Sequence, residues 1–180
     1  MPATRSEQRA RTRQNLLDAT VGCLVEFGYA GTTTQRVQER AGVSRGALLH
    51  HFGSKEDLFV AAIHHIAEQQ LVRVRAAGAG AGSQRHLVTA LREAMSGPLF
   101  LAGLELWLGA RTDPALRAAL LPAERELGRE LRETFESFSD DRIGYESLLV
   151  LLRGLALTSI LRDDPAVAGA IVDRWFERMA

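Results

Sequence analysis

Cross-links and membrane-spanning segments are the features that this sequence most clearly lacks. It contains one cysteine, Cys23, so an internal disulfide framework is excluded. The longest apolar run, 148–161, is shorter than the roughly 20 residues that cross a bilayer, and it contains Arg153. The chain does not begin with an apolar segment and a small-residue cleavage site. We therefore expect a cytoplasmic protein that folds around an apolar core and makes no use of a membrane.

Signals for β-structure and lysine residues are also scarce. The chain has no extended alternation of apolar and polar residues and no Asn-Gly or Asp-Gly hairpin between β-branched runs. This predicts an all-α fold. Lys55 is the only lysine among 22 basic residues. Such a bias towards arginine fits a bacterial gene rich in G and C, and it carries no information about activity.

Constellations that perform chemistry are missing as well. His50 and His51 are adjacent, and adjacent residues on a helix point roughly 100° apart, so the pair cannot ligate one metal ion. His64 and Glu68 have a helical spacing, but no further ligand follows nearby. Cys23 lies on an apolar stripe, and no glycine-framed nucleophilic serine occurs. We expect a protein that is not an enzyme and that holds no metal and no cofactor.

The helical periodicity of apolar residues is the strongest positive signal. A glycine-rich segment at 78–84 is predicted to be a linker. Apolar residues that recur at three and four, with caps and breakers between them, predict a first helix at 6–27, two short helices that end near Ala41 and Phe52, and longer helices at 54–76, 85–95, 98–110, 114–138, 142–161 and 166–179.

The stretch AGVSRGALLHHFGSK, at 41–55, has the pattern of a helix-turn-helix. Gly42 supplies a left-handed turn residue, Val43 can anchor the turn, and Ser44 can cap the second helix. Leu48 and Phe52 stack one turn apart on the buried face. The opposite side can enter a major groove, and it is formed by Arg45, Gly46, Ala47, Leu49 and His50.

Charge is distributed unevenly although the formal net charge is zero. Residues 1–53 carry seven arginines against four acids, a formal +3, and the remainder is acidic by the same amount. A basic N-terminal part joined to an acidic body is a weak sign of a DNA-contacting segment. Arg5, Arg9 and Arg13 share one helical face, and they either reach the DNA backbone or are simply solvated.

The segment GYAGTTTQRVQERAGVSRGALLHHFGSKEDLF resembles the DNA-binding domain of the TetR family of bacterial transcription regulators. The resemblance covers roughly 13–63, and it is carried by Gly28, Thr32, Ala41, Gly42, Val43, Ser44, Leu48, Phe52, Ser54, Lys55 and Leu58. It implies a homodimer with an N-terminal helix-turn-helix domain at 1–53. A larger helical domain, at 54–180, is then expected to bind a small-molecule inducer and to dimerise.

The resemblance also implies which residues contact DNA. Arg45, Gly46 and Ala47 fall where the family reads bases, and Lys55 falls on a phosphate contact. His50 and His51 fall where the family meets the backbone or packs, and for His51 packing is an equal alternative. The second helix, which also touches DNA in the family, opens with Thr33, Gln35 and Arg36.

Two positions depart from the family pattern. Leu49 stands where a tyrosine is frequent, which removes a phenol that could donate to phosphate. We include Leu49 in the predicted DNA surface because of its place on the helix. Gln38 stands where a small alanine is usual, which affects how closely the second and third helices approach.

In the body, the predicted ligand contacts are Ile63 and Ile66 on the inner face of the long helix, together with Trp107. The helix at 142–161 is apolar nearly all round, so it and 166–179 are predicted to form the dimer interface. The sequence thus predicts a ligand-responsive transcriptional regulator, in the first place a repressor that binds a palindromic operator in double-stranded DNA. The alternative is a helical DNA-binding protein that answers to a partner protein or has no inducer.

Overall fold

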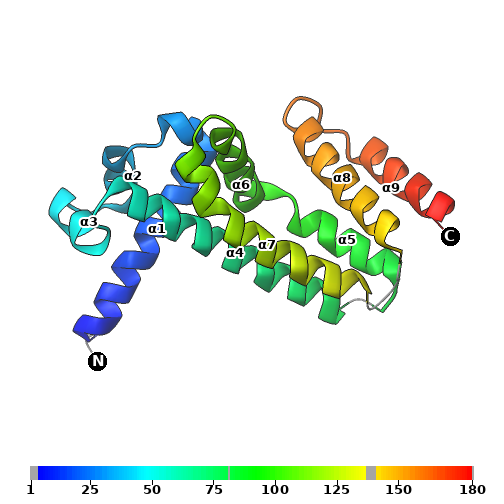
Figure 1. Ribbon diagram of the computed structural model, residues 1–180, viewed down its shortest axis with the longest axis horizontal. Coiled ribbons are helices and arrows are strands. Elements are labelled where there is room, and N and C mark those ends of the chain that lie inside the picture. Colours follow the sequence, from blue (N-terminus) through cyan, green and yellow to red (C-terminus); the bar gives the residue numbers. More distant parts are fainter. Residues whose placement is uncertain (1–3, 81, 137–140, 180) are drawn as a thin grey trace. The chain divides into compact units, whose positions relative to one another are not determined.

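The computed structural model describes residues 4–80, 82–136 and 141–179, and within these ranges every regular element is an α-helix. The all-α prediction is confirmed. The helices, in chain order (Figure 1), are α1 (Arg5–Gly31), α2 (Thr34–Ala41), α3 (Arg45–His51), α4 (Lys55–Gly80), α5 (Gln84–Ala94), α6 (Gly97–Ala110), α7 (Pro114–Glu136), α8 (Arg142–Ser159) and α9 (Pro165–Met179).

The chain divides into two compact units. Among the described residues, the first unit contains 4–70 and 98–127, and the second contains 71–80, 82–97, 128–136 and 141–179. This division follows packing and does not locate a functional boundary, so the predicted domains 1–53 and 54–180 remain predictions. Within the described residues, no helix is both long enough and apolar enough to cross a bilayer.

Helix α4 is longer than its sequence predicts. The glycine-rich segment was expected to be a linker from residue 78, but the helix continues through Gly80. At Gly78 a Cβ atom would come within 2.8 Å of Thr134 Cγ2 on α7, so close packing of the two helices explains the glycine. Phe138 and Asp140, the predicted end of α7 and the break after it, lie outside the described residues.

Helix α1 is bent at Gly28 rather than ended there. Gly28 has φ 67° and ψ 177°, and one more helical turn follows to Gly31. A positive φ is strained for a residue with a side chain, which explains the glycine. Thr32 closes this turn: it is fully buried, and its hydroxyl donates to the carbonyl oxygen of Gly28 at 2.7 Å.

Gly42 ends the first short helix and Ser44 caps the second, as the sequence predicts, and the structure shows which threonine caps the first. Thr33 caps α2, and Gly42 ends it with φ 65° in the left-handed region. Ser44 then caps α3 by accepting from the Ala47 amide. These helices share a core with α1 and α4, which consists of Leu16, Leu17, Ala19, Cys23, Val37, Leu48, Phe52, Leu58 and Ala62. Cys23 is a fully buried core residue, as predicted.

A second core of the first unit joins α1, α4, α6 and α7. It is formed by Leu24, Phe59, Ile63, Ile66, Leu99, Ala102, Leu106, Ala110, Leu116, Leu120 and Ala123. In the second unit, α8 and α9 lie side by side (Figure 1), and the Trp175 indole donates to the Ser147 hydroxyl at 2.9 Å.

Tyr29 lies where α1, α4, α6 and α7 meet. The bend at Gly28 frees its N–H, which donates to Glu105 Oε2 at 3.2 Å, and its hydroxyl donates to Asp113 Oδ2 at 2.8 Å. Its ring lies edge-on to Phe59 with centroids 5.3 Å apart. A Cβ on Gly109 would come within 2.5 Å of Tyr29 Cδ1, so only glycine leaves room for the ring. We call these five residues, namely Tyr29, Phe59, Glu105, Gly109 and Asp113, the Tyr29 junction.

Burial and hydrogen bonds in the Tyr29 junction shift the pKa values of Tyr29 and Asp113. Burial, and then the hydrogen bond to Asp113, raise the pKa of Tyr29 to about 12. Hydrogen bonds from the Leu116 amide and from Tyr29 hold the pKa of Asp113 below its usual value. Because the folded pKa of Tyr29 is raised, its contribution to stability is present below the unfolded value of about 10 and is lost as the pH rises through about 12.

The raised pKa of Tyr29 can be measured directly because the chain has only two tyrosines. The substitution Tyr145→Phe leaves Tyr29 as the sole tyrosine. We expect the absorbance of its phenolate to appear with a midpoint at about pH 12. A midpoint near pH 10, the value of a free tyrosine, would show that Tyr29 is neither buried nor bonded to Asp113 in solution.

Candidate nucleic-acid interface and ligand cavities

Helix α3 presents one buried and one exposed face. Leu48 is 1% exposed and anchors the helix in the first core. Arg45, Gly46 and His50 are exposed on the other side, Ala47 is half-buried, and Leu49 is 47% exposed. An apolar side chain of that size on an open helix face is available for contact with a thymine methyl group.

Arg45 is the best placed of the predicted base-reading residues. It is the first residue of α3, directly after the capping Ser44. Within the described part of the chain, its guanidinium has no hydrogen-bond or ion-pair partner. An arginine with all its donors unused can form a fork with O6 and N7 of a guanine.

The predicted contacts on α2 are engaged within the protein to different degrees. Thr33 is exposed, and its hydroxyl accepts from the Arg36 amide at 3.2 Å. Gln35 donates to the Glu39 side chain at 2.9 Å. The Arg36 guanidinium donates to the carbonyl oxygen of Gly31 and lies 4.2 Å from the centroid of the Phe27 ring. Arg36 therefore ties α2 to the end of α1, and its contact with DNA stays a prediction.

The two histidines differ in environment. His50 is exposed, and its ring lies edge-on to that of His51 with centroids 5.8 Å apart. His51 is half-buried beside Phe52. Burial, and then the positive charges of His50, Arg9 and Arg13, lower the pKa of His51. At neutral pH His51 is thus an uncharged ring with polar edges, which suits packing and still permits a hydrogen bond to phosphate.

Basic residues of α1 lie beside the end of α3. The Arg13 guanidinium lies 5.5 Å from the centroid of the Phe52 ring, and the charges of Arg9 and Arg13 act on His51. Arg5 is exposed in the first turn of α1. Arg13 therefore lies beside the end of α3, and whether Arg5, Arg9 and Arg13 reach DNA or are simply solvated stays a prediction.

Lys55 begins α4 and is exposed, as a phosphate contact requires. Its ammonium lies 5.3 Å from the centroid of the Phe59 ring, which holds the side chain close to the first unit's core. Gln38, the other departure from the family pattern, is half-buried, and its carbonyl oxygen accepts from the Val43 amide at 3.0 Å. Helices α2 and α3 are in contact in spite of the larger side chain at this position.

The predicted ligand residues do not share one environment. Ile63 and Ile66 are 2% and 5% exposed, and they are packed in the second core. Trp107 lines a cavity of about 430 Å³ and donates from its indole to Glu124 Oε1 at 2.7 Å. The other lining residues are Ala110, Arg111, Arg117, Leu120 and Leu121.

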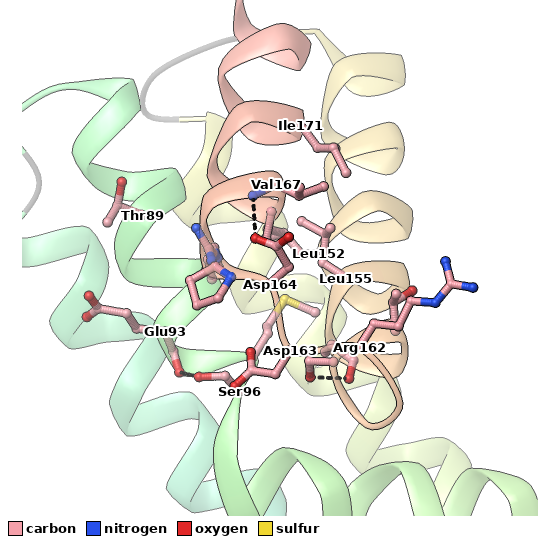
Figure 2. Close-up of a pocket in the computed structure, with 17 residues that line it drawn as sticks. Thr89, Glu93, Ser96, Leu152, Leu155, Arg162, Asp163, Asp164, Val167 and Ile171 are labelled. Atoms are coloured by element: carbon pink, nitrogen blue, oxygen red, sulfur yellow. Dashed lines mark hydrogen bonds between the residues drawn. The ribbon is translucent and has the colours of Figure 1, made fainter.

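A larger cavity, of about 840 Å³, lies within the second unit (Figure 2). Its apolar wall includes Met95, Leu152, Leu155, Val167 and Ile171. Polar and charged groups also line it, from α5 and from the turn between α8 and α9, among them Thr89, Glu93, Arg162, Asp163 and Asp164. The described residues contain no group of three or more His, Cys, Asp or Glu side chains arranged to hold a metal ion.

Sequence reasoning missed the Tyr29 junction and the contact of Arg36 with Gly31. It also missed the anchoring of His65: this buried ring on α4 lies 3.0 Å from Asp18 Oδ1 on α1. Two local signals point towards Tyr29 and Asp113, namely the glycine before Tyr29 and the proline after Asp113. Neither signal indicates that the two residues are partners.

Comparison with known proteins gives a consistent result. Residues 16–62 match the model of the family described as bacterial regulatory proteins, tetR family. The transcriptional repressor AcnR of Corynebacterium glutamicum is 32% identical over 136 residues, which are 73% of this chain and 68% of AcnR. The transcriptional regulator BetI of Paraburkholderia phytofirmans is 31% identical over 163 residues, 85% of this chain and 84% of BetI.

A solved structure with a bound small molecule is also similar. The multidrug binding protein EbrR in complex with imidazole has a TM-score of 0.63 and 28% identity, over 91% of this chain and 93% of EbrR. EbrR has also been solved with ethidium and with proflavin. The relatives compared are named regulators or binding proteins, in agreement with the expectation that this chain is not an enzyme.

Proposed function

The chain belongs to the tetR family of bacterial regulatory proteins, and we propose that it is a transcriptional repressor that binds an operator as a homodimer and is released by a small molecule. The observation that carries the DNA-binding part is the exposed face of α3. Arg45 lies in the first turn of this helix, and its guanidinium has no partner within the part of the chain that the structure describes. Helix-turn-helix proteins place such a helix in the major groove, where its N-terminal residues contact the base edges.

The proposed interface divides into two functions. Arg45, Gly46, Ala47 and Leu49 face base edges, because they occupy the exposed first turns of α3. The surrounding residues contact phosphate and set the register of the protein on the duplex, and these are Thr33, Gln35, His50, His51 and Lys55 together with Arg9 and Arg13 of α1. Arg36 joins them if DNA displaces its bond to Gly31.

The proposed homodimer is supported by apolar side chains that remain exposed on α8 and α9. On α8, Ile143 is 74% and Val150 is 69% exposed, and on α9 Val167 is 54% exposed. Such side chains gathered on two adjacent helices are a typical protein interface. A second copy with the same two helices would cover them in a four-helix arrangement. Two recognition helices related by a two-fold axis then require an operator that is an inverted repeat.

The proposed inducer site lies at Trp107, between α6 and α7. The cavity of about 430 Å³ combines an aromatic wall, two leucines and charged groups, which is the usual composition of a small-molecule site. The capture of imidazole, ethidium and proflavin by EbrR supports a ring-containing ligand. Ile63 and Ile66 belong to the second core, against which Trp107 packs.

The alternative function, regulation by a partner protein or without an inducer, draws support from the same packed core. Ile63 and Ile66, which the sequence predicts as ligand contacts on the inner face of α4, are buried and packed in the second core. We favour the small-molecule reading because Trp107 does line an open cavity. Saturation of this cavity by a ligand that leaves operator affinity unchanged would favour the alternative.

The division between base reading and phosphate contact predicts opposite behaviour for two variants. Arg45→Ala should weaken specific binding by about 1 to 3 kcal/mol and relax the preference at one base pair of each half-site. Lys55→Ala should weaken binding to all duplexes alike and reduce the salt dependence by about one unit of slope. Titrations of specific and scrambled duplexes at several salt concentrations distinguish the two. Uniform losses in both variants would show that Arg45 does not read a base.

The proposed dimer predicts that a charge on the exposed face of α8 separates the protomers. Val150→Glu should sediment as a monomer at a micromolar concentration at which the unsubstituted chain is a dimer, because a carboxylate would be buried without a partner. Val72→Glu is the matched control, since Val72 is 62% exposed but lies on α4. It should remain a dimer. If the unsubstituted chain itself sediments as a monomer at this concentration, the proposed dimer is wrong.

A further inference from the structure

The cavity at Trp107 and the Tyr29 junction are built on the same turn of the first unit. Trp107 and Gly109 stand two residues apart on α6, so one contributes to the cavity and the other makes room for the Tyr29 ring. Asp113 follows this helix, and its Oδ1 accepts from the Leu116 amide at 3.0 Å, which caps α7. Its carbonyl oxygen accepts from the amide of Arg117, a lining residue of the cavity, at 3.0 Å.

The same junction is connected to the recognition helix by a short path. Thr32, three positions after Tyr29, is buried, and its hydroxyl donates a hydrogen bond to the Gly28 carbonyl oxygen. The carbonyl oxygen of Gly31 receives the Arg36 guanidinium of α2. The bond from the Val43 amide to the Gln38 carbonyl oxygen closes the end of α2 and fixes the start of the turn that leads into α3. A displacement of 29–31 therefore moves α2 and α3 together.

We infer that Tyr29 is a positioning residue that transmits the state of the Trp107 cavity to the helix-turn-helix. Two carboxylates on α6 and at the start of α7, Glu105 and Asp113, hold its amide and its hydroxyl. A ligand that spreads α6 and α7 moves Asp113, and Tyr29 then loses one of its two anchors. The inference rests on the proposed function, because it assigns the internal route by which occupation of that cavity alters operator binding.

The role of Tyr29 follows from preorganisation. An anchored Tyr29 restricts the orientations that α2 and α3 can adopt, and a group that is ordered before binding loses less freedom when DNA is bound. Release of the hydroxyl leaves the ring against Phe59 but removes the fixed distance to α7. The recognition helix then remains folded and binds its operator less tightly.

The test uses two charge-neutral substitutions in the full chain, so that attraction to phosphate is unchanged. Tyr29→Phe keeps the ring and removes the hydroxyl. Gly109→Ala displaces the ring, because its Cβ would lie 2.5 Å from Tyr29 Cδ1. Tyr145→Phe is the control, since it removes a buried hydroxyl that donates to the Gly128 carbonyl oxygen in the second unit. Operator affinity is measured by fluorescence anisotropy at a temperature at which circular dichroism shows every variant to be folded.

We expect Tyr29→Phe and Gly109→Ala each to weaken operator binding roughly tenfold, the scale of one hydrogen bond to a charged group. The double variant should be weakened by clearly less than the product of the two effects, because both act on one ring. Tyr145→Phe should lower thermal stability and leave operator affinity unchanged. A folded Tyr29→Phe variant with unchanged affinity would assign Tyr29 a purely structural role and overturn the inference. An unsubstituted chain that prefers no DNA sequence would instead overturn the proposed function.

Discussion

The exposed face of α3 depends on the burial of two side chains on its other face. A helix of seven residues is too short to be stable alone in water, because nucleation costs more than so few hydrogen bonds return. Leu48 and Phe52, which are 1% and 4% exposed, attach it to a core shared with α1 and α4. Burial of side chains of this size contributes about 1.5 to 3 kcal/mol each. The residues that we propose to contact DNA are held in place by residues buried on the opposite face of the helix.

The same principle explains why a chain without net charge can carry a DNA-binding surface. On α1, Arg13 is positioned by packing, since its guanidinium lies over the ring of Phe52 at the end of α3. Arg36 and Arg40 are instead engaged within the protein, with Gly31 and Glu26 respectively. The net charge of the chain is therefore a poor indicator of DNA binding, and the position of each arginine relative to α3 is a better one.

Local chemistry made much of this fold predictable. Thr33, Gly42 and Ser44 delimit α2 and α3 because caps and left-handed turns act within a few residues. Contacts between distant segments were not predictable from spacing. Tyr29 and Asp113 are 84 residues apart, and Gly78, near the end of α4, packs against Thr134 of α7. For the predicted ligand residues, periodicity indicated that Ile63 and Ile66 face inward, but it could not identify the residues of other helices that pack around them in the second core.

The central claim is that two copies of α3, presented by a two-fold dimer, read a defined DNA sequence. Selection of bound duplexes from a random library by the purified chain tests it most directly. The account predicts enrichment of an inverted repeat whose half-sites are centred about 10 base pairs or a multiple of that apart, because the two helices must meet major grooves on one face of the duplex. Enrichment of a single unrepeated site, or of no sequence at all, would contradict it.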